Sequence, residues 1–407
     1  MRWLIVEDAL QDRTGHWFES MRTFRDGLVA LDDHVTLLVS NKAEPFIVDE
    51  LHARPVLPTS IWHRMSDNSG ILVRDFRVSW HAFQTWRTVG AELKADSQYD
   101  IIFVPTVSVH HLLGWVWLIK GVLRNNRARI LLYFLSTPIR VRADGNPEWI
   151  KSPTTWLMAR LLSSMRKEID RGKVIIGVET VPLRDAFSRV AGIPVRYLPQ
   201  PVAAFAKTEA KKTDELLFGC YGPARHEKGS DILAAAVEAF LRKHPDSRAK
   251  FAVQWLKDFS LPNGRLSAIP AGLKQDPRVE IIRHFFRDGE YASWLDHTDV
   301  VILPYRLSSY GLRGSRVLIE AMVHGIPVVV TRGTSLAKQA EEFGAAVLCE
   351  DENVESLVGA ISEMEQNYDV LQSLALARMQ TAREHFSVRK FRESSYAESK
   401  TTRLTEV

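Results

Sequence analysis

The chain has 407 residues, so two domains are the default, because single hydrophobic cores usually stop growing at about 250–300 residues. Hydrophobic residues make up 45% and charged residues 25%, which is ordinary for a soluble globular protein, and no apolar run is long enough to span a bilayer. Cys220 and Cys349 have no metal-ligand spacing, and the amino-terminal segment is too short and acidic for a signal peptide, so we expect a cytoplasmic protein.

The net charge of +4 is unevenly distributed. Residues 1–200 hold 26 Lys and Arg against 21 Asp and Glu (26 − 21 = +5), whereas residues 201–407 hold 27 against 28 (27 − 28 = −1). A basic excess of this size is compatible with an ordinary solvated surface. It would also suit an acidic acceptor or an anionic membrane surface.

Short apolar runs alternate with amphipathic stretches along the chain, which is the pattern of strands and helices in an open α/β sheet. In the first half, we predict strands at residues 2–7, 34–40, 99–105, 129–135, 173–179 and 195–202, and helices at residues 18–31, 109–124 and 181–192. In the second half, we predict strands at residues 216–222, 250–256, 279–285, 299–305, 326–331 and 345–350, and helices at residues 230–245, 288–298, 317–325, 335–344 and 354–366. Residues 369–400 are predicted to be helical and charged.

This alternation predicts two doubly wound, Rossmann-like α/β domains with parallel sheets. The small, polar and charged stretch at residues 203–214 predicts a linker between a first domain at residues 1–202 and a second domain that begins at residue 215. Ligands of open α/β sheets bind beyond the carboxyl ends of the strands, so we expect the ligand in a cleft between two facing domains.

The stretch SRVLIEAMVHGIPVVVT, residues 315–331, places Glu320 inside an otherwise apolar helix and strand. Glu320 is either a solvent-facing residue of an amphipathic helix or a carboxylate that accepts hydrogen bonds from ligand hydroxyls, such as those of a ribose. Gly314 and Ser315 precede the helix, and Tyr305 lies upstream of them; the backbone amides and the Ser315 hydroxyl could bind phosphate.

Two further loops follow predicted strands. Arg225 and Lys228 precede a helix whose predicted N-cap is Ser230, which would make an anion site suited to a diphosphate, although two solvated loop charges are the plainer interpretation. Gly15 follows the first strand and would let the backbone approach a ligand closely, or it only shapes a turn.

These motifs resemble those of retaining glycosyltransferases of family 4, which have the GT-B fold. LPYR…GSRVLIEAMVHGIPVVVT resembles the donor-site signature of that family, and YGPARHEKGSDIL resembles its phosphate-binding K-G-x-D-x-L segment. The resemblance implies an acceptor-side domain at residues 1–202, a nucleotide-sugar domain at residues 215–380 and a helix at residues 381–407 that crosses back toward the first domain.

The resemblance also implies roles for single residues. Glu320 would hold the nucleotide ribose, and Arg225 and Lys228 would hold the diphosphate. Gly314 and Ser315 would meet the distal phosphate. Gly15 would belong to the glycine loop near donor and acceptor.

The sequence departs from the family pattern in two places. Leu312 stands where the first glutamate of the E-x7-E motif is expected, and Ser136 stands where the family has a histidine near the donor sugar. His110 and His111 are substitute candidates for a catalytic histidine, although a histidine at a helix start more often has a structural role. The catalytic group is therefore left open.

The resemblance implies transfer of a sugar, with retention, from a nucleotide sugar to a glycan or lipid-linked acceptor in polysaccharide or glycoconjugate biosynthesis. We expect no metal and no other cofactor, because no D-x-D triplet occurs in a suitable loop and basic residues could stabilise the departing diphosphate. Two alternatives stay open: a nucleotide-sugar epimerase of the same fold, and a non-catalytic protein that binds sugar nucleotides or glycans. Nothing indicates a nucleic-acid partner.

A helix at residues 109–124 also predicts peripheral membrane contact. Trp115, Trp117, Leu118 and Ile119 lie ahead of several basic residues, a combination that suits the inner membrane face. A helix that packs on a sheet has a similar sequence, so both interpretations stay open.

Overall fold

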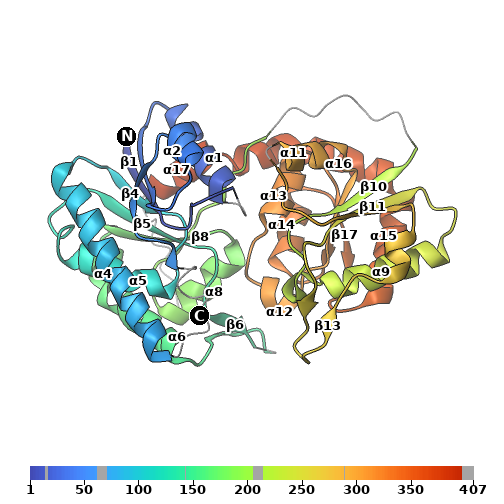
Figure 1. Cartoon of the computed structure of the whole chain (residues 1–407), viewed down its shortest axis with the longest axis horizontal. Helices are drawn as coiled ribbons and strands as arrows, with labels where there is room; N and C mark the ends of the chain where they lie inside the picture. The colour runs from blue at the N-terminus through green and yellow to red at the C-terminus, as the bar shows by residue number, and fades with distance from the viewer. Residues whose placement is uncertain (14–16, 62–70, 143, 205–213, 288, 397–407) are drawn as a thin grey trace, which may run out of the picture. The chain divides into compact units, whose positions relative to one another are not determined.

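The computed structural model describes residues 1–13, 17–61, 71–142, 144–204, 214–287 and 289–396, with the backbone alone for residues 71–75. The chain forms two compact units (Figure 1). The first unit is Met1–Pro201 together with Val388–Val407, and the second unit is Val202–Ser387. Most of the predicted linker at residues 203–214 lies outside the described residues.

The first unit is built on a seven-stranded sheet. Its strands are β1 (Arg2–Glu7), β2 (His34–Ser40), β3 (Arg54–Leu57), β4 (Ile101–Val104), β5 (Arg129–Phe134), β8 (Val174–Val178) and β9 (Arg196–Tyr197). Its helices are α1 (Trp17–Val29), α2 (Pro45–Leu51), α4 (Ile71–Ala95), α5 (Val109–Lys120), α6 (Pro153–Ser164), α7 (Arg166–Asp170), α8 (Val181–Ala191) and α17 (Val388–Tyr396). A small hairpin, β6 (Ile139–Val141) with β7 (Pro147–Trp149), is appended.

The strand order of this sheet is β3-β2-β1-β4-β5-β8-β9, and every pairing in it is parallel. Strands β4 and β8 are buried along their whole length, and β1 and β5 are buried except for their first residue, because helices cover both faces of the sheet (Figure 1). On one face, Phe391 of α17 packs against Phe24 of α1 and Phe103 of β4. The last described helix therefore completes the core of the first unit.

The second unit repeats this architecture with a six-stranded sheet. Its strands are β10 (Leu216–Cys220), β11 (Ala249–Gln254), β14 (Val279–Ile282), β15 (Val300–Leu303), β16 (Val328–Thr331) and β17 (Ala346–Cys349). Its helices are the 3-10 turn η1 (His226–Lys228), α9 (Ser230–Lys243), α10 (Ala271–Gln275), α11 (Glu290–His297), α12 (Leu307–Tyr310), α13 (Arg316–Val323), α14 (Ser335–Phe343), α15 (Val354–Gln366) and α16 (Tyr368–His385). A hairpin of β12 (Phe259–Ser260) and β13 (Leu266–Ser267) lies outside the sheet.

The second sheet has the order β14-β11-β10-β15-β16-β17 and is also parallel throughout. Numbered along the chain, this is strand order 3-2-1-4-5-6, with a reversal between β10 and β15 where ligands of such sheets bind. One hydrophobic core joins the sheet to α9 and α15, and another joins it to α13, α14 and α16. The prediction of two doubly wound parallel sheets is confirmed.

Several elements are absent from the sequence-based prediction: α2, β3, the long helix α4, the short helices α7, α10 and α12, and both small hairpins. The predicted cleft between the two domains stays a prediction. Among the described residues, the structure contains no helix that combines the length and the apolar character needed to span a membrane.

Candidate functional site

Lys228 lies beyond the carboxyl end of β10, on the side where the neighbouring strand is β15. Its ammonium is 5.6 Å from the centre of the Tyr305 ring, and a side chain at Gly222 would overlap it. The pKa of Lys228 is lowered to about 8, chiefly by burial; nearby Arg225 and Arg313 act in the same direction, while Cys220 and Glu227 oppose it. Within the described part of the chain, Lys228 has no ion pair, so this cationic loop holds charge that an anion could neutralise.

Arg306 joins the loop after β15 to the loop after β10 by hydrogen bonds. Its guanidinium donates two parallel hydrogen bonds, of 2.9 and 2.8 Å, to the carboxylate of Asp231 at the start of α9. It also donates to the carbonyl of His226, and its backbone N–H donates to the carbonyl of Glu227 at 3.1 Å. The loop after β15 is thereby fixed to the turn that carries Lys228.

The turn after Lys228 also packs closely against the residue that follows β15. Gly229 has φ 62° and lies against the carbonyl of Pro304, where the Cβ of any other residue would overlap that oxygen. Both the positive φ angle and the close contact with the Pro304 carbonyl require a glycine at this position. Together with the Arg306–Asp231 pair, this packing explains the sequence K-G-x-D that follows β10.

The amino terminus of α13 forms the other side of the loop cluster. Ser315 caps the helix, since its hydroxyl accepts a hydrogen bond from the backbone N–H of Leu318 at 3.4 Å. The Ser335 hydroxyl of α14 lies within hydrogen-bond distance of the carbonyls of Tyr310 and Arg313, and its single proton is shared between them, which stabilises the loop that contains Gly314. The first turn of a helix carries partial positive charge, which adds to that of the nearby cations.

Glu320 is buried, with 8% of its surface exposed, so its interpretation as a solvent-facing residue is wrong. One carboxylate oxygen accepts a hydrogen bond from Arg316 at 2.7 Å, and the other accepts one from the Tyr291 hydroxyl at 2.6 Å. These contacts leave acceptor capacity on the carboxylate, which has about four lone-pair positions. The buried carboxylate is therefore oriented and can still bind a hydroxyl.

The remaining predicted donor-site residues differ in their surroundings. Tyr305 is buried and packs on Tyr310 at 4.5 Å between ring centres, whereas the Arg225 side chain is 59% exposed, 3.6 Å from Glu227. Gly15 lies outside the described residues. Leu312 is half-buried in the connection between α12 and α13.

Sequence reasoning did not single out Arg306, Arg313 and Tyr291. Arg306 and Arg313 lie within the stretch that resembles a family signature, LPYR…LRGS, and only that position could have pointed to them. Nothing in the sequence links Tyr291 to Glu320, because they belong to different helices 29 residues apart.

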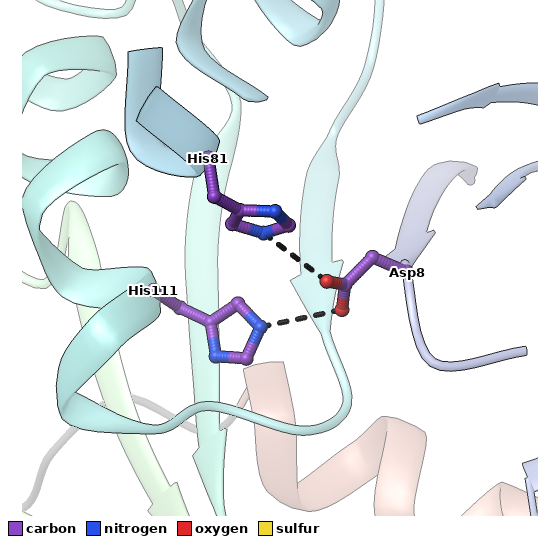
Figure 2. A group of neighbouring side chains, drawn as sticks. All are labelled: Asp8, His81 and His111. Atoms are coloured by element: carbon purple, nitrogen blue, oxygen red, sulfur yellow. Dashed lines mark hydrogen bonds and ion pairs between the residues drawn. The ribbon is translucent and has the colours of Figure 1, made fainter. Parts of the chain in front are cut away.

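In the first unit, His111 is buried near the start of α5, and His110 beside it is half-buried. The His111 Nδ1 accepts a hydrogen bond from the Ser108 backbone N–H at 3.0 Å, and its Nε2 is 3.2 Å from Asp8, at the end of β1. His81 of α4 reaches the second oxygen of the same carboxylate, also at 3.2 Å (Figure 2). Burial opposes ionisation of Asp8, but the two histidines outweigh it and hold the pKa of Asp8 far below its usual range.

Comparisons with known proteins agree with this architecture. The family model described as "Glycosyl transferases group 1" matches residues 215–367. The lipopolysaccharide core biosynthesis mannosyltransferase LpsB of Rhizobium meliloti (strain 1021) is 27% identical over 164 residues, which are 36% of this chain and 42% of that protein. The chain thus spans less than half the length of the curated relative that it matches.

Two solved structures are similar over almost the whole chain. A glycosyltransferase from Rickettsia africae ESF-5 has a TM-score of 0.66 at 13% identity and covers 96% of both chains. HepE from Anabaena, solved in complex with UDP, has a TM-score of 0.61 at 14% identity and covers 97% of this chain and 98% of its own. Identities this low show a shared fold, which is GT-B.

Proposed function

We propose that this protein is a retaining glycosyltransferase that uses a nucleoside diphosphate sugar, because residues 215–367 match the family model described as "Glycosyl transferases group 1". Its acceptor would be a glycan or a lipid-linked glycan in polysaccharide or glycoconjugate assembly. The lipopolysaccharide mannosyltransferase and the UDP complex of Anabaena HepE support this proposal. The single observation that carries it is the cationic loop around Lys228, which has no anionic partner for that lysine among the described residues.

The chemistry of donor cleavage explains why such a loop is needed. Departure of a nucleoside diphosphate builds negative charge on the phosphate that was linked to the sugar. Lys228, Arg225, Arg313 and the amino terminus of α13 would stabilise this charge with groups already held in place. Glu320 would accept hydrogen bonds from the ribose hydroxyls.

Calorimetry with UDP, GDP, ADP and TDP tests donor binding directly. We expect one of these nucleotides to bind the wild-type protein, and Lys228→Met to weaken binding by about 10- to 100-fold, as for loss of a hydrogen bond to a charged group. Lys243→Met is a matched control, since Lys243 lies on α9, pairs with Glu355 at 2.5 Å and should leave affinity unchanged. Absence of binding by all four nucleotides would refute the proposal.

Product analysis separates glycosyl transfer from the alternatives. Incubation with a nucleotide sugar and candidate acceptors should yield a product with the anomeric configuration of the donor. An epimerase would convert the donor with no acceptor present, and a non-catalytic binding protein would leave it intact.

We further propose that the first unit contacts an anionic membrane surface, through aromatic residues of α4 rather than those expected on α5. The prediction for α5 is wrong for Trp115, Leu118 and Ile119, which are buried in the core, and only Trp117 is exposed. That core position explains their apolar character without a membrane.

On α4, by contrast, Phe76, Trp80 and Phe83 are 69%, 47% and 36% exposed. Their spacing of four and three residues places them on one face of the helix, and the rings of Trp80 and Phe83 stack at 5.5 Å. Helix α5 packs between α4 and α6 (Figure 1), and α6 exposes Trp156 with Arg160 stacked over it at 4.8 Å. Exposed aromatic and basic side chains are the composition that binds anionic interfaces.

Vesicle sedimentation tests this surface. We expect the wild-type protein to bind vesicles that contain phosphatidylglycerol and to bind pure phosphatidylcholine weakly, and Trp80→Ser to reduce binding. Phe285→Ser is the control, because Phe285 is a 53% exposed aromatic residue of the second unit. Equal binding by both variants would refute this assignment.

A further inference from the structure

Asp8, His81 and His111 form a buried cluster beyond the carboxyl ends of β1 and β4, the neighbouring strands at which the order of the first sheet reverses. They come from three elements, namely the end of β1, α4 and α5 (Figure 2). The cluster lies in the first unit, and the donor-site residues discussed above, except Gly15, lie in the second unit. The proposed binding of the donor does not use the cluster, although His111 is also one of the two candidates for a catalytic histidine.

The geometry of the cluster fits a metal ion. The Nε2 atoms of both histidines each lie 3.2 Å from a different oxygen of Asp8, and one ligand atom from each residue lies within 4.8 Å of the others. Ligands at about 2.0–2.1 Å from a tetrahedral zinc ion are about 3.3 Å apart, and each histidine lies at about that separation from one oxygen of Asp8. A zinc ion held by a single carboxylate oxygen requires one of the two histidines to move closer to that oxygen. We propose that Asp8, His81 and His111 bind a divalent transition-metal ion, with zinc as the best match.

The donor set determines the class of metal. Two imidazole nitrogens and one carboxylate oxygen suit zinc and its neighbours in the first transition row, whereas magnesium and calcium prefer oxygen ligands. Three protein ligands leave a fourth position open, as in catalytic zinc sites. The backbone N–H of Ile61 donates to Asp8 at 2.9 Å and orients the carboxylate.

Ser108 supplies the outer contact that a ligating histidine needs. In the structure described here, the Ser108 backbone N–H donates to Nδ1 of His111, which places the ring proton of the neutral form on Nε2. Metal binding at Nε2 requires the proton on Nδ1 instead, and the Ser108 hydroxyl, 2.9 Å from Nδ1, can accept it. Metal binding would therefore exchange the Asp8–His111 hydrogen bond for a metal bond and the Ser108 backbone N–H bond to Nδ1 for a bond from Nδ1 to the Ser108 hydroxyl.

Metal titration of the full chain tests the proposal. Protein stripped with a chelator is titrated with Zn²⁺, Co²⁺ and Mg²⁺, and bound metal is counted by mass spectrometry. We expect about one equivalent of Zn²⁺, a visible absorption band from bound Co²⁺, and no competition by Mg²⁺.

Single substitutions then locate the site. His81→Gln and Asp8→Asn should each abolish stoichiometric binding, and Ser108→Ala should weaken it by about 10- to 100-fold. The control is His284→Gln, since His284 faces a single carboxylate, Glu290, at 2.7 Å. Thermal unfolding in chelator shows which variants fold. A metal-dependent rise in Tm should occur in the wild type and the control, be smaller in Ser108→Ala, and be absent in His81→Gln and Asp8→Asn.

Two results would overturn the proposal. One is a folded wild-type protein that binds no Zn²⁺ or Co²⁺ at equimolar concentration. The other is metal binding that persists unchanged in folded His81→Gln and Asp8→Asn proteins. If both variants fail to fold, the Co²⁺ spectrum and stoichiometry of the wild-type protein decide the matter alone.

Discussion

The affinity of the protein for its nucleoside diphosphate should fall as pH rises above about 8. The pKa of Lys228 is lowered from 10.5 to about 8 in the protein without ligand, chiefly by burial. A bound diphosphate would neutralise this cation and return its pKa toward 10.5. Because the protonated form binds and is lost above pH 8, affinity must decrease as pH rises through this pKa.

The size of the effect follows from the two pKa values. A difference of about 2.5 in pKa corresponds to about 3 kcal/mol at the alkaline limit. With those two values, affinity should be about tenfold weaker at pH 9 than at pH 7, and binding at pH 9 should take up about 0.9 proton. The terminal phosphate of the ligand ionises near pH 6, so it contributes little to this change.

Calorimetry in buffers of different ionisation enthalpy measures both the affinity and the proton uptake. Lys228→Met should bind more weakly at pH 7 and lose the pH dependence above pH 8, while Lys243→Met should behave as the wild type does. A flat affinity between pH 7 and 9, or the same proton uptake in Lys228→Met, would refute the reasoning.

Three further predictions concern other parts of the structure. Glu320→Gln should weaken nucleoside diphosphate binding by about 1–3 kcal/mol and leave inorganic pyrophosphate binding unchanged, because the carboxylate is assigned to the ribose; equal losses for both ligands in calorimetry would contradict this. Arg306→Met should destabilise the second unit by about 3–5 kcal/mol in denaturant titration, because it leaves the partly buried Asp231 carboxylate without its bidentate partner. An unchanged unfolding midpoint would show that the Arg306–Asp231 pair does not contribute to stability. Burial opposes ionisation of Asp33, but hydrogen bonds from Arg392, the amino terminus and Trp3 lower its pKa to about 2. About 1–2 kcal/mol of the free energy of unfolding, present above pH 4, should therefore be lost as pH falls toward 2. In Asp33→Asn, the free energy of unfolding should depend less on pH over this range.

The secondary structure near the donor loops could be predicted from sequence because each element is marked locally. In residues 315–331, a capping serine, an apolar helix face and a β-branched run define α13 and β16. Helix α4 could not be predicted in this way. Its face with Phe76 and Trp80 is exposed, so its apolar residues do not mark one buried stripe.

The candidate site could be predicted only in part, for a related reason. Lys228, Ser315 and Glu320 are marked by nearby glycine or capping positions. The contacts that orient the site join residues far apart in the chain: Arg306 and Asp231 are separated by 75 residues, and His111 and Asp8 by 103. Such pairs depend on which strands become neighbours, which a local pattern does not specify.

The two units place polar groups at the same topological position but balance their charge differently. Beyond β1 and β4, the Asp8 carboxylate is met by two imidazoles, which compensate it within the unit. Beyond β10 and β15, burial lowers the pKa of Lys228, the nearby charges of Arg225 and Arg313 act in the same direction, and no described carboxylate pairs with Lys228. A loop that keeps positive charge beside a helix amino terminus favours the binding of an anion, which supports the proposal that the second unit binds the donor phosphate.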